Sequence, residues 1–283
     1  MCPLGNRYDH HENFGGHHSP RAYAVYQITP ALTLKTGVAR AFRAPTLLQG
    51  SPNWGSVSCG SATVGCYIVG NPNLRPETST SQEIGLHLDQ GSFGAGVTLF
   101  HSELQDMIDI SNRTADPVLG ATYPNYVGRL TDGRPVFAYE NVAKVRTQGL
   151  EASLRVDINS QWALRGSYTY THAHARNTSA ATSTALAYRP RHQANVTLDW
   201  KPAARWSLQG VLRHVGKQIT TVWNNITKPA YEIIDLSAAF RVNETFTVRT
   251  DLLNVADQGV QRKDSAGYNE EGRRVFVSLS AKF

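Results

Sequence analysis

Two histidine doublets near the N-terminus are the first residues whose type suggests metal binding. His10 and His11 are followed closely by His17 and His18, and imidazole nitrogen is a common ligand of zinc and related metals. Neighbouring residues of a strand point to opposite faces, so at most half of these rings could converge on one ion. We therefore predict neither a dedicated metal site nor a resident cofactor.

Catalytic motifs with a defined spacing are absent from the sequence. It contains no Gly-x-Ser-x-Gly elbow, no phosphate-binding loop and no HExxH pair of zinc ligands. Ser, His and Asp are abundant, but no spacing singles out a triad, and the carboxylates occur singly rather than in pairs. The sequence therefore predicts a protein that is not an enzyme.

Two of the three cysteines lie close together. Cys59 and Cys66 flank a stretch rich in Gly, Ser and Thr, which has the composition of one loop. A disulfide there would contribute about 2–3 kcal/mol in the chain-entropy model, and it requires an oxidising compartment such as the periplasm or cell surface. We predict this disulfide, with two free thiols as the alternative and Cys2 left over.

Composition and charge exclude several broad classes of protein. The chain has 283 residues, of which 41% are hydrophobic and 18% charged, too apolar a composition for a disordered protein. No apolar run approaches the roughly 18 residues of a spanning helix, whereas barrel strands alternate in polarity and leave no such run. The net charge of +6 comes from basic residues dispersed along the chain, so we expect no nucleic-acid partner.

Alternating polarity dominates the sequence and indicates strands with one polar face. In residues 149–157 every second residue from Leu150 to Val156 is apolar. The same alternation recurs near residues 83–89, 194–200, 235–241 and 274–283. A soluble sandwich alternates in the same way, so this pattern by itself leaves sandwich and barrel open.

The lengths of the connections favour a barrel. Very short links are expected at about residues 29–30, 89–91, 157–160, 202–204 and 242–245. They alternate with long links at about residues 11–18, 43–78, 102–141, 172–190, 215–230 and 255–273. About twelve antiparallel strands result, with all tight turns at one end and all long loops at the other, the layout of an outer-membrane barrel.

Aromatic residues and arginines support the same interpretation. Seven aromatic residues on apolar faces lie near a short turn or the C-terminus, as in one membrane girdle: Tyr26, Trp162, Trp200, Trp206, Phe240, Phe246 and Phe283. An Arg facing lipid near the midplane would cost about 2–4 kcal/mol. We therefore expect the arginines of the polar faces to line a lumen: Arg155, Arg165, Arg213, Arg241 and Arg249. Core aromatics and an open soluble sheet are the alternative explanations.

Six sets of short segments occur in a fixed order along the chain. They are AFRAPT (41–46), NPNLRPETS (71–79), QEIGL (82–86), YENV (139–142) with TQGLE (147–151), DLLNVAD (251–257) and YNEEGR (268–273). This series resembles the motifs of TonB-dependent outer-membrane receptors and spans nearly the whole chain. The resemblance implies a barrel of about 22 strands around a plug, of which this chain would supply about twelve.

The predicted fold is therefore all-β, an antiparallel transmembrane β-barrel segment in the cell outer membrane. Residues 1–283 are expected to form the C-terminal half of a plugged receptor barrel, because no plug, TonB box or signal peptide is recognisable. The resemblance implies four partners: the TonB-ExbB-ExbD energy-transducing complex, acting through the missing plug and TonB box, a ferric siderophore, the barrel assembly machinery and outer-membrane lipids. Phe283 would be the C-terminal signal for membrane insertion.

Further segments point to a class of ligand. RYDHH (7–11), GHHSPR (16–21) and SPNWG (51–55), with the loop cysteines, resemble the ferric-catecholate and colicin receptor branch. Such ligands are anionic and carry flat rings, so a receptor needs Arg and aromatic side chains at its loops. The candidate ligand-binding residues are Trp54, Tyr67, Arg113, Tyr123, Tyr126, Arg129, Arg176, Trp223 and Arg262. Loop packing or solvation is the alternative role of each.

The predicted function is uptake of a ferric siderophore, of the catecholate type, energised by TonB in the full-length protein. Haem is the second ligand considered, but residues 46–70, between two of the motifs, contain no His to serve as axial ligand. From a different class, the alternative is a passive pore or surface-binding barrel without transport, such as a colicin or phage receptor or a vestigial fragment. The missing plug is the feature that discriminates between these functions.

Overall fold

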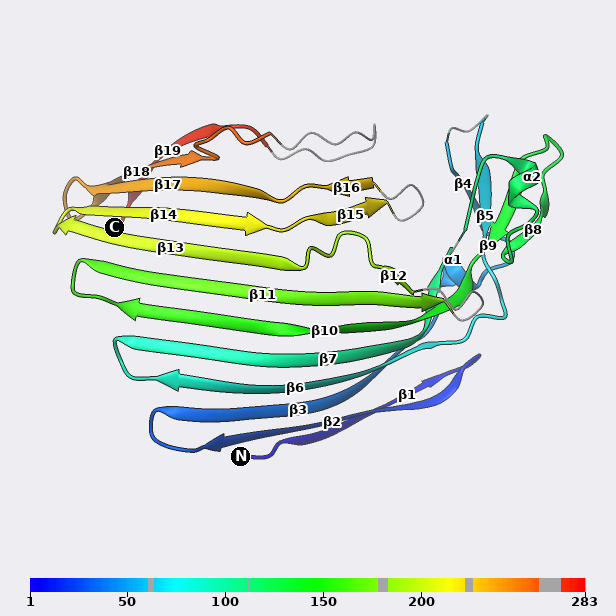
Figure 1. Ribbon diagram of the computed structural model, residues 1–283, viewed down its shortest axis with the longest axis horizontal. Coiled ribbons are helices and arrows are strands. Elements are labelled where there is room, and N and C mark those ends of the chain that lie inside the picture. Colours follow the sequence, from blue (N-terminus) through cyan, green and yellow to red (C-terminus); the bar gives the residue numbers. More distant parts are fainter. Residues whose placement is uncertain (61–63, 111, 178–182, 222–225, 260–270, 283) are drawn as a thin grey trace.

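The protein is built from one large antiparallel sheet (Figure 1). A computed structural model describes residues 1–60, 64–110, 112–177, 183–221, 226–259 and 271–282. The main path of the sheet runs in the order β1 (Leu4–His11), β2 (Gly15–Gln27), β3 (Leu32–Arg43), β6 (Glu77–Asp89), β7 (Phe93–Asp109), β10 (Glu140–Asp157), β11 (Trp162–Asn177), β13 (His192–Ala203), β14 (Trp206–Val215), β17 (Tyr231–Arg241), β18 (Phe246–Leu253) and β19 (Arg274–Ala281). These twelve strands confirm the predicted number, and a short strand β12 (Ser183–Ala185) pairs beside β11.

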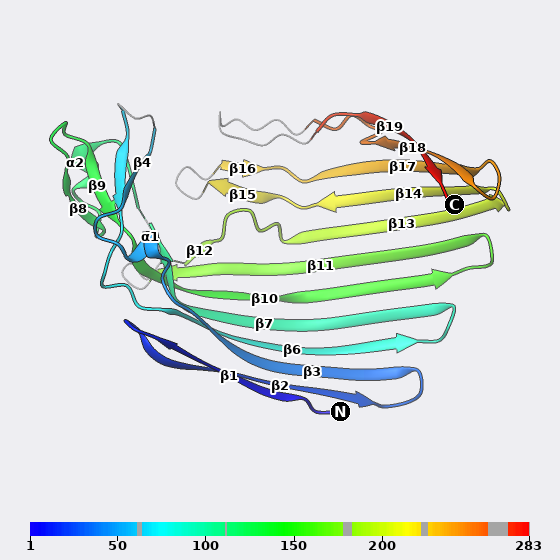
Figure 2. The same cartoon turned by 180° about the vertical axis from the view of Figure 1, so that it is seen from behind.

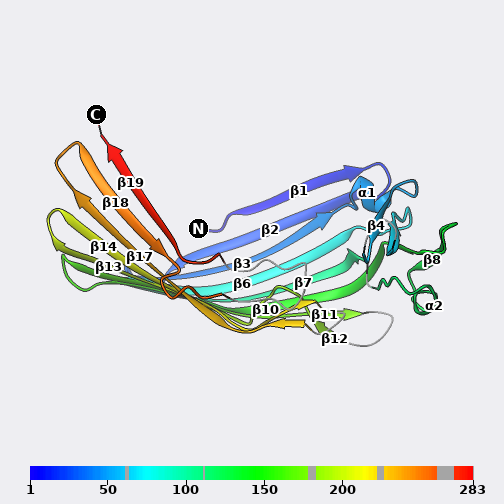
Figure 3. The same ribbon diagram turned by 90° about the horizontal axis from the view of Figure 1, so that it is seen from above.

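The sheet is a curved, open trough when it is seen from above (Figure 3). Its two edges are β1 and β19, and the ladders of the described residues run from one to the other without joining them. The structure of this chain is therefore a curved segment of a cylinder rather than a closed twelve-strand cylinder.

Apart from the β1–β2 hairpin, tight turns and long connections lie at opposite ends of the strands, as predicted (Figures 1 and 2). The tight turns are residues 28–31, 90–92, 158–161, 204–205 and 242–245. They lie at the end where Figures 1 and 2 place both chain termini. We call this the short-turn end of the sheet, and the opposite end the long-loop end.

One predicted long loop is wrong. Residues 11–18 form a tight hairpin, because the β1–β2 ladder continues through both histidine doublets up to the pair His11 and Gly15. Gly15 has φ +73°, a left-handed conformation that lets the chain reverse within three residues. Likewise, β7 extends to Asp109, well into the segment expected to be a loop from residue 102.

The two faces of the sheet differ in polarity along the middle of the strands. Leu34, Leu86, Val97 and Ala152 pair across four neighbouring strands and therefore lie on one face. Leu86 and Val97 remain 47% and 46% exposed although they are large and apolar. We call this the apolar face; the residues between them in sequence form the polar face.

The aromatic residues predicted as a girdle lie on the apolar face near the short-turn end. The Trp162 and Trp200 rings stack with centroids 4.9 Å apart, and the Trp206 and Phe240 rings lie 4.7 Å apart. Their cross-strand pairing places them on the same face as Leu208 and the apolar rows. Tyr26 and Phe246 belong to the same face, whereas Phe283 lies outside the described residues.

The arginines predicted to line a lumen lie on the polar face, and each has a partner. Arg155 binds Asp89 at 3.0 Å, Arg213 binds Asp235 at 2.9 Å and Arg249 binds Asp251 at 2.8 Å. Arg165 pairs with Asp199, and Arg241 donates to the carbonyl oxygen of Ala204 at 3.1 Å. These five arginines therefore find their partners within the polar face.

Shorter strands and helices lie at the long-loop end. A four-stranded sheet there has the order β4 (Gly55–Ser58), β5 (Cys66–Val69), β9 (Pro135–Ala138), β8 (Tyr126–Arg129), and β15 (Gln218–Thr221) pairs with β16 (Ile226–Lys228). The helices of the described segments, α1 (Leu47–Gly50) and α2 (Pro117–Gly120), have four residues each. No helix in that part of the chain is long and apolar enough to cross a membrane.

Candidate functional site

The small sheet at the long-loop end joins two loops that are distant in sequence. β5, from the loop after β3, pairs in parallel with β9, from the loop after β7. Phe137 is fully buried at the centre of this sheet and packs with Cys66, Ile68 and Ile110. The two loops therefore form one packed unit above the barrel strands rather than two independent segments (Figure 1).

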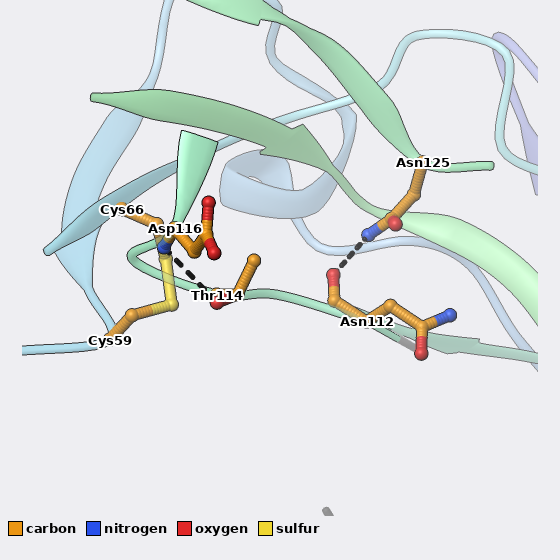
Figure 4. Close-up of a disulfide and its surroundings, with 6 residues drawn as sticks. All are labelled: Cys59, Cys66, Asn112, Thr114, Asp116 and Asn125. Atoms are coloured by element: carbon orange, nitrogen blue, oxygen red, sulfur yellow. Dashed lines mark hydrogen bonds between the residues drawn. A yellow bond between two sulfur atoms is a disulfide. The ribbon is translucent and has the colours of Figure 1, made fainter. Parts of the chain in front are cut away.

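A disulfide closes the turn end of the β4–β5 hairpin in this unit. Cys59 and Cys66 are joined with an S–S distance of 2.03 Å (Figure 4), and Cys2 is free and exposed. Cys66 is the first residue of β5 and is fully buried against Phe137, so the crosslink ties Cys59, directly after β4, to the core of the small sheet.

Polar side chains of the second loop supply its local order. Asn125 is 4% exposed and donates to the Asn112 carbonyl at 2.8 Å, and the Asp116 amide donates to Thr114 Oγ1 at 3.1 Å (Figure 4). Asp116 Oδ1 in turn accepts from Val118 N at 2.8 Å and caps α2. These bonds satisfy backbone groups that would otherwise be unpaired inside the unit.

The motif residues that carry the family resemblance are structural anchors at the long-loop end. Asn141 donates to the Arg75 and Asp106 carbonyls at 2.9 and 2.7 Å, and its Oδ1 accepts from the Arg75 amide at 2.8 Å. Arg75 also binds Asp106 by an ion pair at 2.6 Å. Asp106 has φ +56°, and the β7–β10 ladder shifts register in this region. The motifs therefore lock an irregular strand end into one geometry.

A second motif anchor lies between β18 and β19. Asn254 has φ +50° and is 4% exposed, and its amide donates to Asp235 Oδ1 at 2.8 Å. Its side chain donates to the carbonyls of Gln258 and Glu271 at 3.2 and 2.9 Å. One residue thus holds both ends of the last long connection.

The acidic residues of the loop at residues 102–141 are engaged in structural bonds. Glu103 binds Lys144 and Arg146, and Asp106 binds Arg75. Asp132 binds the amide and the guanidinium of Arg134, which together hold the pKa of that carboxyl below its usual value. These three carboxylates therefore do not present free negative charge to a ligand.

The predicted aromatic ligand residues lie in or beside the small sheet. Trp54, Tyr123 and Tyr126 pack against the cluster around Phe137 and are half-buried. Tyr67 lies on β5, also half-buried. The structure thus brings these four residues together, but the first three contribute a large part of their surface to loop packing.

The predicted basic ligand residues are separated. Arg129 is exposed on β8 and donates to the Pro117 carbonyl at 2.9 Å, and Arg113 is half-buried in the same loop. Arg176 is exposed at the end of β11 opposite Lys144, on the continuation of the apolar face, so it lies apart from the other two. Trp223 and Arg262 lie outside the described residues.

Arg75 is a further exposed basic residue at the long-loop end, outside the predicted set of ligand residues. Its side chain is 69% exposed at the rim of the long-loop end although it is bound to Asp106. Its position within the NPNLRPETS motif was the available signal, but the motif gives no indication of exposure. Arg129 shares β8 with the half-buried Tyr126, and an exposed guanidinium group with an aromatic ring suits an anionic, aromatic ligand. Among the described residues no group of three or more His, Cys, Asp or Glu is placed to hold a metal ion.

Comparisons with known proteins agree with this architecture. A family model described as TonB dependent receptor-like, beta-barrel, matches residues 4–255. The iron-regulated outer membrane virulence protein of Vibrio cholerae is 34% identical over 99% of this chain, and a ferric enterobactin receptor of Pseudomonas aeruginosa is 30% identical over 100%. This chain covers 42% and 40% of those two proteins, so it spans about two fifths of the length of these relatives.

The fold is also similar to solved structures along its whole length. A crystal structure of a mutant ferric enterobactin receptor from Pseudomonas aeruginosa, in complex with enterobactin, matches with a TM-score of 0.80 at 27% identity. The match covers 100% of this chain and 43% of that one. The open trough of this chain therefore corresponds to part of a larger barrel.

Proposed function

This chain belongs to the family of TonB-dependent receptor β-barrels, and on that premise we propose that residues 1–283 form the C-terminal part of a ferric-siderophore receptor barrel. Members of this family are transporters rather than enzymes, and the protein is located in the outer membrane. The proposed cargo is a ferric siderophore of the catecholate type, and no resident cofactor takes part. TonB-ExbB-ExbD would supply the energy for transport, and the barrel assembly machinery would insert the chain.

One observation carries the proposal. A relative named ferric enterobactin receptor aligns with every part of this chain, and a related receptor in complex with enterobactin has the same fold over the same extent. Both loops that form the small sheet lie within the aligned region, so the similarity includes the long-loop end as well as the barrel strands.

The chemistry of the long-loop end supports this class of cargo. Arg129 presents an exposed guanidinium group that stays charged at any physiological pH, and Arg75 presents a second, which is already paired with Asp106. Tyr67 and Tyr126 offer half-buried rings on the same small sheet as Arg129. A ferric catecholate is anionic and flat-ringed, so it can gain both charge attraction and ring contacts at such a surface. No acid–base step is needed for binding.

Uptake by iron-starved cells tests the proposal. The gene that encodes this chain would be deleted from its host, and uptake of radioactive iron would be measured with ferric enterobactin and with a ferric hydroxamate as control. We expect catecholate uptake to fall severalfold while hydroxamate uptake is unchanged. Unchanged catecholate uptake, or a loss confined to the hydroxamate, would contradict the cargo.

The energy source needs a separate measurement in the same cells. Collapse of the proton gradient with a protonophore is expected to stop catecholate uptake and to leave binding at the cell surface intact. Uptake that continues after the gradient has collapsed would contradict TonB energisation while leaving the ligand class in place.

A further inference from the structure

The apolar face ends at the same level on five neighbouring strands. One cross-strand row on this face, running from β3 to β11, consists of Thr36, Ile84, Leu99, Leu150 and Tyr170. The next row towards the long-loop end consists of Val38, Gln82, His101, Gln148 and His172. The row after that consists of Arg40, Thr80, Glu103, Arg146 and His174, and Lys144 pairs with Arg176 beyond it. The face therefore changes from apolar to basic within two rows.

The level of this change matches the outer boundary of the bilayer. His172 follows the girdle residue Trp162 by ten positions on β11. At about 3.4 Å per residue and a strand tilt of about 40°, these positions span roughly 26 Å along the membrane normal. The apolar band of an outer-membrane barrel is about 25 Å tall. Because this surface faces lipid below that level, Lys144, Arg146 and Arg176 lie among the headgroups of the outer leaflet.

The basic residues line a hollow on this outer surface. A cavity of about 430 Å³ is lined by Lys144, Arg146, Gln148, His172, His174 and Arg176. The His172 and His174 rings lie with their centroids 4.2 Å apart. Every lining side chain is able to donate a hydrogen bond, and none is a carboxylate.

One carboxylate borders the hollow and holds two of its cations. Glu103 binds Lys144 at 2.7 Å and Arg146 at 2.8 Å, and this leaves those side chains 43% and 58% exposed. Lys144, Arg146 and Arg176 carry three positive charges against the one negative charge of Glu103. Counting only Lys, Arg and Glu, the cluster therefore keeps a net charge of +2. The ion pairs orient two cations without neutralising the cluster.

We propose that this basic cluster is a binding site for the phosphate group of a phosphorylated glycolipid of the outer leaflet, such as lipid A. The Arg146 and Arg176 guanidinium groups suit bidentate contact with phosphate oxygens, and Lys144 adds a point charge. The acyl chains would extend towards the midplane along Leu99, Leu150 and Tyr170, in the row directly below. This site faces away from the lumen, so it is independent of siderophore binding.

Native mass spectrometry of the natural gene product, purified in detergent, tests the site. The protein would be delipidated and titrated with diphosphoryl lipid A, with dephosphorylated lipid A and with inorganic phosphate. We expect diphosphoryl lipid A to bind at least tenfold more tightly than the dephosphorylated lipid, and inorganic phosphate at the same concentration not to displace it. Equal binding of both lipids would overturn the proposal, because the phosphate would then contribute nothing to affinity. Displacement by inorganic phosphate would also overturn it, because the site would then not require the lipid.

Matched variants separate this site from general charge and folding effects. The triple variant Lys144→Gln, Arg146→Gln, Arg176→Gln should bind diphosphoryl lipid A on the order of a hundredfold more weakly, since each basic residue near the membrane surface contributes about fivefold. The charge-conserving variant Lys144→Arg, Arg146→Lys, Arg176→Lys should retain most of the affinity. Lys35→Gln, on the polar face of β3, should retain all of it. Equal loss in Lys35→Gln, or none in the triple Gln variant, would contradict the site.

Discussion

The buried carboxylate of Glu77 accepts a hydrogen bond from the backbone amide of Ile108 at 2.8 Å, which ties the first residue of β6 to the irregular end of β7. The other carboxylate oxygen binds Arg43 at 2.6 Å, at the last residue of β3. Glu77 is 6% exposed, so a single side chain couples three neighbouring strands where they leave the bilayer. Arg43 lies in the AFRAPT motif and Glu77 in the NPNLRPETS motif. Holding the three strand ends together is therefore a structural role for both motifs.

We expect Glu77→Ala to lower the free energy of unfolding by about 2 kcal/mol, because it leaves the Ile108 amide unpaired in a buried position. Glu77→Gln should cost less, since one amide oxygen can still accept that bond. The measurement is a guanidinium titration of the complete receptor, reconstituted in phosphatidylcholine vesicles and followed by Trp fluorescence. Asp9→Ala, which breaks the more exposed pair with Arg7, is the control and should cost less than about 1 kcal/mol. Equal costs for the Glu77 and Asp9 variants would contradict the anchoring role.

The barrel strands were predictable because their pattern is set by solvent on each face. Alternation from Leu150 to Val156 needs only lipid on one side and polar partners on the other, and the structure shows an apolar and a polar face along this strand. Residues 11–18 misled the prediction because His11, Glu12, Asn13, His17 and His18 place polar side chains on both faces of a hairpin that lies beyond the apolar rows. Polarity alone cannot distinguish such a strand from a loop.

The long-loop end was less predictable because its order depends on contacts between segments distant in sequence. The small sheet forms when β5 meets β9 in parallel, a pairing that no local pattern encodes. The three aromatic residues Trp54, Tyr123 and Tyr126 were identified by type, but their packing around Phe137 depends on this pairing. Arg176 was assigned to a ligand loop because the extent of β11 was underestimated.

The assignment of lipid to the apolar face makes a sharp prediction for adjacent positions on β10. Leu154 is on the apolar face near the middle of the membrane and is 38% exposed, whereas Ser153 is on the polar face. Leu154→Arg should destabilise the reconstituted receptor by about 2 kcal/mol, because the charge must enter lipid. Ser153→Arg adds the same charge to the lumen side and should cost clearly less in the same guanidinium titration. A larger cost for Ser153→Arg would reverse the assignment of the two faces.

The disulfide predicts a specific labelling pattern. In outer membranes isolated without reductant and unfolded in guanidinium, iodoacetamide should modify Cys2 alone, and all three cysteines should react after reduction. The double variant Cys59→Ser, Cys66→Ser should speed proteolytic cleavage between β4 and β5 several-fold without altering cleavage elsewhere. Mass spectrometry of tryptic peptides measures the labelling, and limited digestion with proteinase K measures the cleavage, since residues 59–65 contain no Lys or Arg for trypsin. Modification of Cys59 and Cys66 in the unreduced sample would contradict the crosslink in the natural protein.

Arg129 is the predicted ligand residue best placed to contact an anionic siderophore. Its side chain is exposed on β8, and its bond to the Pro117 carbonyl holds it at the surface of the small sheet. Loss of one charge-assisted hydrogen bond should weaken binding of ferric enterobactin about tenfold in Arg129→Ala, and Arg129→Lys should recover part of the affinity. Quenching of intrinsic fluorescence in the purified receptor measures the dissociation constant. Arg205→Ala, at the short-turn end, is the matched control and should leave it unchanged. If Arg129→Ala binds as tightly as the native protein, the residue serves loop packing alone.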